Sequence, residues 1–426
     1  MEDIKWLFRK YGIVILIMIF VISAGIIIIE QRKKQEFQAE EVWEPSIEIE
    51  NIREKESERE NDVVDSSITE SPYWVIPQAE ECLISDEEKG ELQKNVLSAV
   101  TLVINIYKET IIPGEQKNVI GGIQFPDEQR KKVVEQLGNA GFVATVENAN
   151  MQNYQELERF YTDYQNGQDS MITIYDVYRD GMIGAVTFIY REERLQTYYI
   201  GIQWKEGGNP EIEGTSVSDV AEMKLTEKGY FIYAYKNVIA HASLRQYWRV
   251  KPLSEECREL TRKYLSGLSY VNYNLLVTNW DSSNAEDILM PCMYEDIYRI
   301  ATGENLKVGN GQIPAEEYEK IMTTYFPVSV EQLREHCGYD ASSNTYTYEM
   351  IYSSPYPPFG EVVDYRYNED GTITLIVDGV WADYNSDFAF QNVIVVQPFE
   401  DGSFRYLSNS VEEKELELPP IAKREG

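Results

Sequence analysis

The stretch Met171–Tyr190 reads MITIYDVYRDGMIGAVTFIY and gives the clearest local signal for the fold of this 426-residue chain. Two segments, Met171–Tyr178 and Met182–Tyr190, show the period-two pattern that is typical of β-strands. The residues between them, Arg179-Asp180-Gly181, contain an Asp-Gly step that favours a tight turn. The sequence therefore predicts an antiparallel β-hairpin here.

The regions on either side extend this hairpin into an α+β domain, which we place at residues 73–267. Further strands are predicted at Leu195–Trp204, Val217–Leu225, Tyr230–Lys236 and Leu244–Val250. Helical spacing predicts helices at Asp86–Thr110, Asp127–Leu137 and Asn150–Tyr164, and Ser85 with Glu88 matches a capping box before the first. We expect an antiparallel meander in which helices cover one face and the second face is partly exposed to solvent.

The second half repeats this order of helices followed by strands, which predicts another α+β domain at residues 284–410. Its helices are expected at Glu255–Ser266, in the region between the domains, and at Ala285–Thr302, Ala315–Tyr325 and Val330–His336. Its strands are expected at Thr345–Tyr352, Glu361–Tyr367, Thr372–Val380, Phe390–Gln397 and Ser403–Leu407. This order is similar in outline to nuclear-transport-factor-2-like or cystatin-like folds. Residues 411–426 are predicted to be a charged tail.

Residues 12–29, GIVILIMIFVISAGIIII, form an uncharged run in which only Ser23 is polar. As a helix the run would reach about 27 Å, close to a hydrocarbon core of about 30 Å. We therefore predict an uncleaved transmembrane helix (a signal-anchor) after a short cytoplasmic tail, residues 1–11. A cleaved signal peptide and a buried core helix are the alternatives. The number of basic residues is the same on both sides of the run, so it does not set the orientation. We expect a single-pass topology with an extracytoplasmic body, because long domains are translocated largely regardless of their charge.

The charge of the chain limits the kinds of partner that it can bind. Residues 30–72 carry six basic and 14 acidic residues, which predicts a disordered acidic linker. The whole chain has a formal net charge of −33, which argues against nucleic acid. The expected partners are the lipid bilayer, through the N-terminal helix, and a protein, peptide or glycan ligand.

The sequence nominates no catalytic residue, cofactor-binding residue or metal ligand. No HExxH, nucleophile elbow or P-loop motif is present. Cys82, Cys257, Cys292 and Cys337 are far apart and form no CxxC pair, so neither a zinc site nor a redox motif is indicated, and their disulfide state stays open. Tyr356 and Phe359, in the proline-rich loop of residues 353–360, are the candidate partner contacts. The alternative is that this loop covers a sheet edge.

Three runs in the second half, TTYFPVSVEQLR (323–334), PPFGEVVDYRYNEDGTITLIVDGVW (357–381) and DGSFRYLSN (401–409), carry a family resemblance. The chain resembles an uncharacterised domain-of-unknown-function family of membrane-anchored proteins from anaerobic Gram-positive bacteria, over residues 73–410. The resemblance implies a membrane anchor but transfers no functional residue.

The leading functional hypothesis is a membrane-tethered extracytoplasmic binding or scaffold protein without catalytic activity. One alternative is a component of a membrane secretion or conjugation apparatus, on fold-level analogy. Another is a carboxylate-based cell-wall glycan hydrolase, which needs two acids about 5–10 Å apart. With 72 acidic residues, the sequence cannot single out such a pair.

Overall fold

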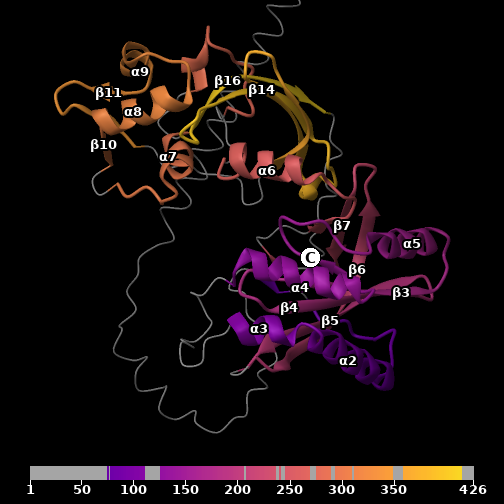
Figure 1. Ribbon diagram of the computed structural model, residues 1–426. Helices are drawn as coiled ribbons and strands as arrows, with labels where there is room; N and C mark the ends of the chain where they lie inside the picture. Colours follow the sequence, from indigo (N-terminus) through magenta and orange to yellow (C-terminus); the bar gives the residue numbers. More distant parts are fainter. Residues whose placement is uncertain are drawn as a thin grey trace, which may run out of the picture. The chain divides into compact units, whose positions relative to one another are not determined.

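The computed structural model describes residues 74–75, 77–110, 125–205, 208–236, 239–240, 245–268, 275–288, 293–308, 311–348 and 358–414. The chain divides into two units, Met1–Ser66 and Ser67–Gly426, and the described residues belong to the second. No described helix is both long and apolar enough to cross a membrane. The predicted transmembrane helix (12–29) and linker (30–72) lie outside the described residues. Figure 1 shows the α+β architecture of the second unit.

The helices that lie before β3 in the chain form where the sequence predicted them, with one interruption. They are α2 (Asp86–Thr101), α3 (Ile104–Thr110), α4 (Asp127–Asn139) and α5 (Tyr154–Gln165). Ser85 accepts a hydrogen bond from the Glu88 backbone N–H, and the Glu88 side chain reaches back to Ser85 N–H at 2.8 Å, so the predicted capping box is confirmed. The single helix expected over Asp86–Thr110 is instead broken at Leu102 and Val103.

Among the described residues, seven strands form the first sheet, in the order β2-β3-β4-β5-β6-β7-β9. The predicted hairpin is confirmed as β3 and β4, with Gly181 at φ +88° in its turn. The short β2 was not predicted, and it pairs parallel to β3, so the sheet is mixed rather than purely antiparallel. A separate two-residue pair joins β1 (Trp74–Val75) to β8 (Ile239–Ala240). The strands of the sheet are β2 (Val143–Thr145), β3 (Ser170–Val177), β4 (Ile183–Arg191), β5 (Arg194–Trp204), β6 (Pro210–Leu225), β7 (Tyr230–Tyr235) and β9 (Arg245–Arg249).

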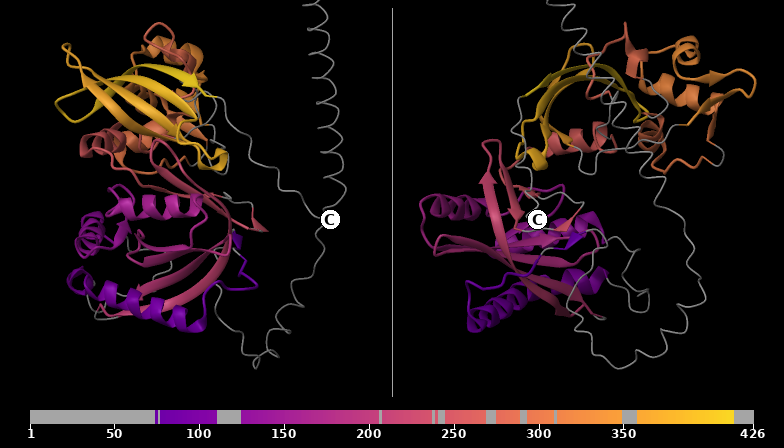
Figure 2. Two further views of the ribbon diagram at one scale, coloured as in Figure 1. Left: turned by 90° about the vertical axis from the view of Figure 1, so that its right-hand side faces the viewer. Right: turned by 180° about the vertical axis from the view of Figure 1, so that it is seen from behind.

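Both faces of this sheet carry buried apolar side chains. This corrects the expectation that one face is partly exposed to solvent. On β3, Tyr175 and Val177 pack with α2 and α4, whereas Ile172 and Ile174 pack in a second cluster with α5. The second cluster forms because the sheet curves strongly, as Figure 2 shows. The curvature brings Trp248 of β9 to a ring-centroid distance of 6.1 Å from Phe188 of β4.

The second half builds a curved four-stranded sheet, ordered β13-β14-β15-β16, around the helix α6 (Glu255–Tyr264) (Figure 1). A smaller sheet, β10-β12-β11, lies beside the other helices. The strand β16 continues to Glu413 and so includes the start of the segment predicted to be a tail. The other elements are η2 (Ala285–Ile288), α7 (Tyr294–Thr302), β10 (Gln312–Pro314), α8 (Ala315–Tyr325), α9 (Val330–His336), β11 (Tyr339–Asp340), β12 (Thr345–Thr347), β13 (Phe359–Tyr367), β14 (Ile373–Val380), η4 (Ala382–Tyr384), β15 (Phe390–Pro398) and β16 (Phe404–Glu413).

One apolar core joins these elements, and it is separate from the two clusters of the first sheet. Its members include Leu260 of α6, Met322 of α8 and Leu375 of β14, all at least 95% buried. The polar exception on the inner face of β15, Asn392, is fully buried and donates to the carbonyl of Leu276 at 2.6 Å. We call residues 77–250 the N-terminal lobe and residues 253–414 the C-terminal lobe.

Candidate functional site

A polar and aromatic junction joins the two lobes. On the N-terminal side it consists of the β6–β7 turn and the faces of β7 and β9, and on the C-terminal side of β13, β14 and the segment that follows β14. A small apolar cluster lies within it, in which Tyr230 and Ile232 pack against Val380 and Ala382. The junction therefore combines apolar burial with the charged contacts described next.

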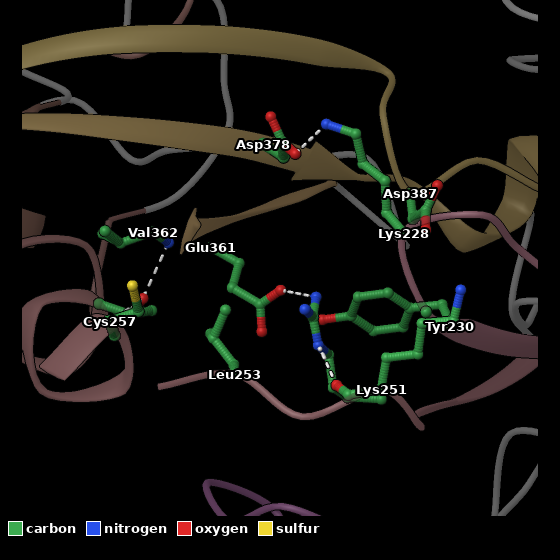
Figure 3. Close-up of polar contacts among 12 residues, drawn as sticks. Lys228, Tyr230, Lys251, Leu253, Cys257, Glu361, Val362, Asp378 and Asp387 are labelled. Carbon is green, nitrogen blue, oxygen red and sulfur yellow. Dashed lines mark hydrogen bonds and ion pairs between the residues drawn. The ribbon is translucent and has the colours of Figure 1, made fainter. Parts of the chain in front are cut away.

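The first charged contact comes from the β6–β7 turn. Lys228 forms an ion pair with Asp378 of β14, as Figure 3 shows. The Asp378 side chain is only 3% exposed, and its second oxygen accepts a hydrogen bond from Gln391 at 2.8 Å. The ammonium group of Lys228 also lies 3.4 Å from the ring centroid of Phe388. The buried carboxylate of Asp378 is thus neutralised by a cation from the other lobe.

The second charged contact comes from β9. Arg249 forms an ion pair with Glu361 of β13. Tyr230 points its hydroxyl towards Glu361 (Figure 3) and interacts with that carboxylate. Burial raises the pKa of Glu361 above its ordinary value, while the positive charges of Arg249 and Arg258 oppose that rise. Burial also raises the pKa of Tyr230 far above its usual range.

Arg258 links this contact to the start of the C-terminal lobe. Burial lowers the pKa of its guanidinium group, and the nearby Glu361 carboxylate opposes that effect. Arg258 donates to Oδ1 of Asn150 at 2.6 Å. Asn150 also exchanges two hydrogen bonds with the backbone of Leu253, each of 2.9 Å. A loop of the N-terminal lobe thereby holds the chain just before α6.

Three further contacts hold the segment of residues 383–387. The hydroxyl of Thr226 donates to the carboxylate of Asp387, and both residues are more than 90% buried. Arg245 donates to the Asp383 carbonyl at 2.8 Å, and Lys224 donates to the Asn385 carbonyl at 3.2 Å. The N-terminal lobe thus supplies most of the donors of the junction, and the C-terminal lobe supplies most of the acceptors.

The two residues predicted from the sequence as partner contacts have different outcomes. Tyr356 lies outside the described residues. Phe359 begins β13 and is partly buried in the junction, where its ring centroid lies 5.5 Å from that of Tyr247 and 6.2 Å from that of Tyr230. The described contacts of Phe359 are therefore internal to the chain.

Glu361 and Asp378 are the closest match in the junction to the paired acids of the hydrolase hypothesis. They are direct register partners on β13 and β14, so their side chains share one face of the sheet. Glu361 is 8% exposed and Asp378 is 2% exposed, and each is paired with a cation. In this arrangement each acid forms an ion pair with a basic side chain of the same chain.

The family comparison spans both lobes and the junction. The model of a family of unknown function, DUF6070, matches residues 89–424. The chain belongs to this family. The recognition of an uncharacterised family from the sequence is therefore confirmed. No curated protein matches the chain. Because the function of DUF6070 is unknown, membership assigns no role to any residue.

Of the residues in this junction of the DUF6070 member, only Phe359 was nominated from the sequence, and it was nominated as an external contact. A signal for Asp378 was nevertheless present, because it follows the apolar run Leu375–Val377 of the strand ITLIVDGV. A carboxylate in a buried strand requires a partner. The identity of that partner, Lys228, could not be inferred, because 150 residues separate the two in the chain.

Proposed function

We propose that the protein is a membrane-tethered extracytoplasmic binding or scaffold protein without catalytic activity. In this proposal the apolar run of residues 12–29 crosses the bilayer and the acidic linker of residues 30–72 separates the lobes from it. The observation that carries the proposal is the junction, in which the buried acids are paired with cations across the two lobes. The curved sheet around α6 supports the outline of a nuclear-transport-factor-2-like or cystatin-like C-terminal lobe.

The junction favours a structural role because its acids are both inaccessible and neutralised. A general acid or a nucleophile must reach its substrate, and charged pairs of this depth have lost most of their contact with solvent. Buried polar contacts of defined geometry favour one relative arrangement of the segments that they join. Two lobes held in this way would present their outer surfaces to a partner as a single body.

Thiol labelling of intact cells tests the tether and its orientation. Cys82 is exposed and lies shortly after the linker, so a membrane-impermeant maleimide should label the full-length protein in intact cells. The Cys82→Ser variant is the matched control and should lose that label. Labelling of Cys82 only after lysis, or recovery of the full-length chain in the soluble fraction, would contradict the proposal.

A carboxylate-based glycan hydrolase is the second candidate, because Glu361 lies opposite Asp378 and has a raised pKa. Incubating the full-length protein with peptidoglycan and measuring released fragments separates the two candidates. We expect no release. Release that the Glu361→Gln variant abolishes, with the circular dichroism spectrum unchanged, would replace our proposal with the hydrolase.

A further inference from the structure

A second acidic residue, Asp176, lies on the inner face of the curved first sheet, away from the junction. It follows Ile172 and Ile174 on the same face of β3, and its side chain is half-buried. The indole N–H of Trp248, on β9, donates to Asp176 Oδ2 at 2.8 Å. Because β3 and β9 lie far apart in the strand order, this hydrogen bond closes the curvature of the sheet.

A row of glycines runs across the sheet from Asp176. The register pairs Asp176 with Gly184, Gly184 with Gly201, and Gly201 with Gly214 on successive strands. Glycine inside a strand often marks a place where another group approaches the backbone closely. The row therefore leaves the sheet beside Asp176 without side chains of its own.

Two tyrosines lie over this row. A Cβ atom at Gly184 would come within 2.2 Å of the Tyr178 hydroxyl, and a Cβ atom at Gly201 would come within 3.2 Å of the Tyr199 ring. The atoms of the two tyrosines therefore occupy space that a side chain at Gly184 or Gly201 would need. Their placement brings the Tyr178 and Tyr199 hydroxyls close enough for the Asp176 charge to raise the pKa of each, in addition to the larger effect of burial.

Aromatic rings from β7 and β9 form the other side of this group. The ring centroid of Tyr233 lies 5.4 Å from that of Trp248 and 5.5 Å from that of Tyr235. Burial raises the pKa of Tyr233 well above its ordinary value, and the negative charge of Asp176 adds to that effect. Aromatic residues that follow β3 or lie on β5, β7 and β9 are therefore grouped around Asp176.

The charge of Asp176 is not matched by a cation in contact with it. Trp248 is the only hydrogen-bond donor to this carboxylate among the described residues, so Oδ1 remains available. The charged groups that influence Asp176 are Glu147, which raises its pKa, and Arg130, which lowers it. Burial is the largest cause and raises this pKa to about 6. By contrast, Glu361 and Asp378, the acids that are buried on the described strands, are both paired with cations.

We propose that Asp176, with the rings of Tyr178, Tyr199, Tyr233 and Trp248, forms a binding site for an organic ammonium ion. The Asp176 oxygen without a donor supplies the ion pair, and the tyrosine and tryptophan rings supply faces that attract a cation. A neutral polyol could accept and donate hydrogen bonds here but would leave the charge of Asp176 unmatched. The net charge of −33 attracts cations to the protein in general. This inference does not depend on the membrane anchor or on the junction.

The test uses n-butylammonium as the probe and the full-length protein labelled with ¹⁵N-tryptophan. The indole N–H resonance of Trp248, assigned by its loss in Trp248→Phe, should shift and saturate as n-butylammonium is added. The Asp176→Asn variant retains an acceptor for Trp248 but lacks the charge, and we expect its affinity to fall about tenfold or more. The matched control Asp364→Asn, an exposed acid on β13, should bind like the wild type.

Three results measured at a single pH would overturn the proposal. They are the absence of any saturable shift, equal binding by wild type and Asp176→Asn, and equal binding of n-butanol, the neutral analogue of the probe. The pH dependence of binding is measured on the wild type alone, so this test does not require a variant that folds. Binding of n-butylammonium should weaken as the pH falls below about 6, where Asp176 takes up a proton, and an affinity independent of pH would also contradict the site.

Discussion

Glu361 and Asp378 lie directly opposite each other on β13 and β14, yet each pairs with a different cation of the N-terminal lobe. Two adjacent buried carboxylates would repel each other if both were ionised and unpaired. Arg249 and Lys228 remove that repulsion only when the two lobes are docked. The negative charges of Glu361 and Asp378 in the C-terminal lobe are thus neutralised by cations of the N-terminal lobe.

The first prediction concerns the Arg249–Glu361 pair. Replacing Arg249 with Met leaves Glu361 buried without its main partner, so we expect the free energy of unfolding to fall by about 3–5 kcal/mol. Urea unfolding monitored by tryptophan fluorescence measures this loss. The exposed Arg366 of β13, replaced with Met, provides the matched control and should change stability by less than about 0.5 kcal/mol.

The double variant Arg249→Met, Glu361→Gln tests whether that loss comes from the unpaired charge. Because neither ion remains, the double variant should be more stable than Arg249→Met alone. Additive losses from the two single substitutions would show that the residues do not interact, and would count against the junction as described.

The second prediction concerns Asp176 and pH. Its folded pKa of about 6 lies above the 3.8 of an ordinary Asp, so the native state binds this proton more tightly than the unfolded state. The stabilising contribution of this residue is present below about pH 4 and is lost as the pH rises through about 6. Asp176→Asn should therefore be more stable than the wild type by about 1–3 kcal/mol at about pH 7.5, with the difference shrinking towards about pH 4.

Thermal unfolding of both proteins across that pH range measures the effect. A stability difference that does not change with pH would show that Asp176 ionises like an exposed acid. The destabilisation is consistent with a ligand site, because residues that bind ligands often reduce the stability of the unliganded protein.

The third prediction concerns the β4–β5 turn. Glu192 and Glu193 occupy its two central positions with φ of +52° and +60°, which L-residues rarely adopt. Glycine prefers such positions in tight hairpin turns. Glu193→Gly should therefore raise the free energy of unfolding by about 0.5–1 kcal/mol in a denaturant titration.

The opposite substitution at another turn is the control. Gly402 has φ +90° and open space around its Cβ position, so Gly402→Ala adds backbone strain without a clash. It should lower stability by about 1 kcal/mol. A stabilising effect of Gly402→Ala, or a destabilising effect of Glu193→Gly, would refute the turn geometry.

The fourth prediction concerns the capping box of α2. Ser85→Ala removes the acceptor for the Glu88 N–H and should lower the free energy of unfolding by about 1 kcal/mol. The exposed Glu91 of α2, replaced with Ala, should have little effect and serves as the control. Hydrogen exchange at the first turn of α2 measures the local consequence, and unchanged protection in Ser85→Ala would contradict the cap.

Local signals accounted for most of the secondary structure. The Asp-Gly turn expected at Asp180-Gly181 forms, with Gly181 at positive φ. The helices Ala315–Tyr325 and Val330–His336 have the expected bounds. The strand β2 was missed because its three residues are too short to show a period, and its pairing with β3 is a parallel contact across α5.

The candidate sites could not be predicted in the same way. Asp176 and Trp248 are 72 residues apart, and Arg249 and Glu361 are 112 residues apart. A charged or polar residue on an apolar strand indicates that some partner is needed, but not which one. Phe359 was nominated for an external contact, whereas its described ring contacts are with Tyr230 and Tyr247.

The sequence by itself determined the α+β class, the hairpins and caps, the acidic character and the family, because periodicity, turn residues and composition act over short stretches of chain. Only the tertiary structure decided that the first sheet curves until β3 meets β9, and that the turn carrying Lys228 reaches Asp378. Those contacts depend on how twisted sheets close and dock, which is a property of the whole packed body rather than of any local segment.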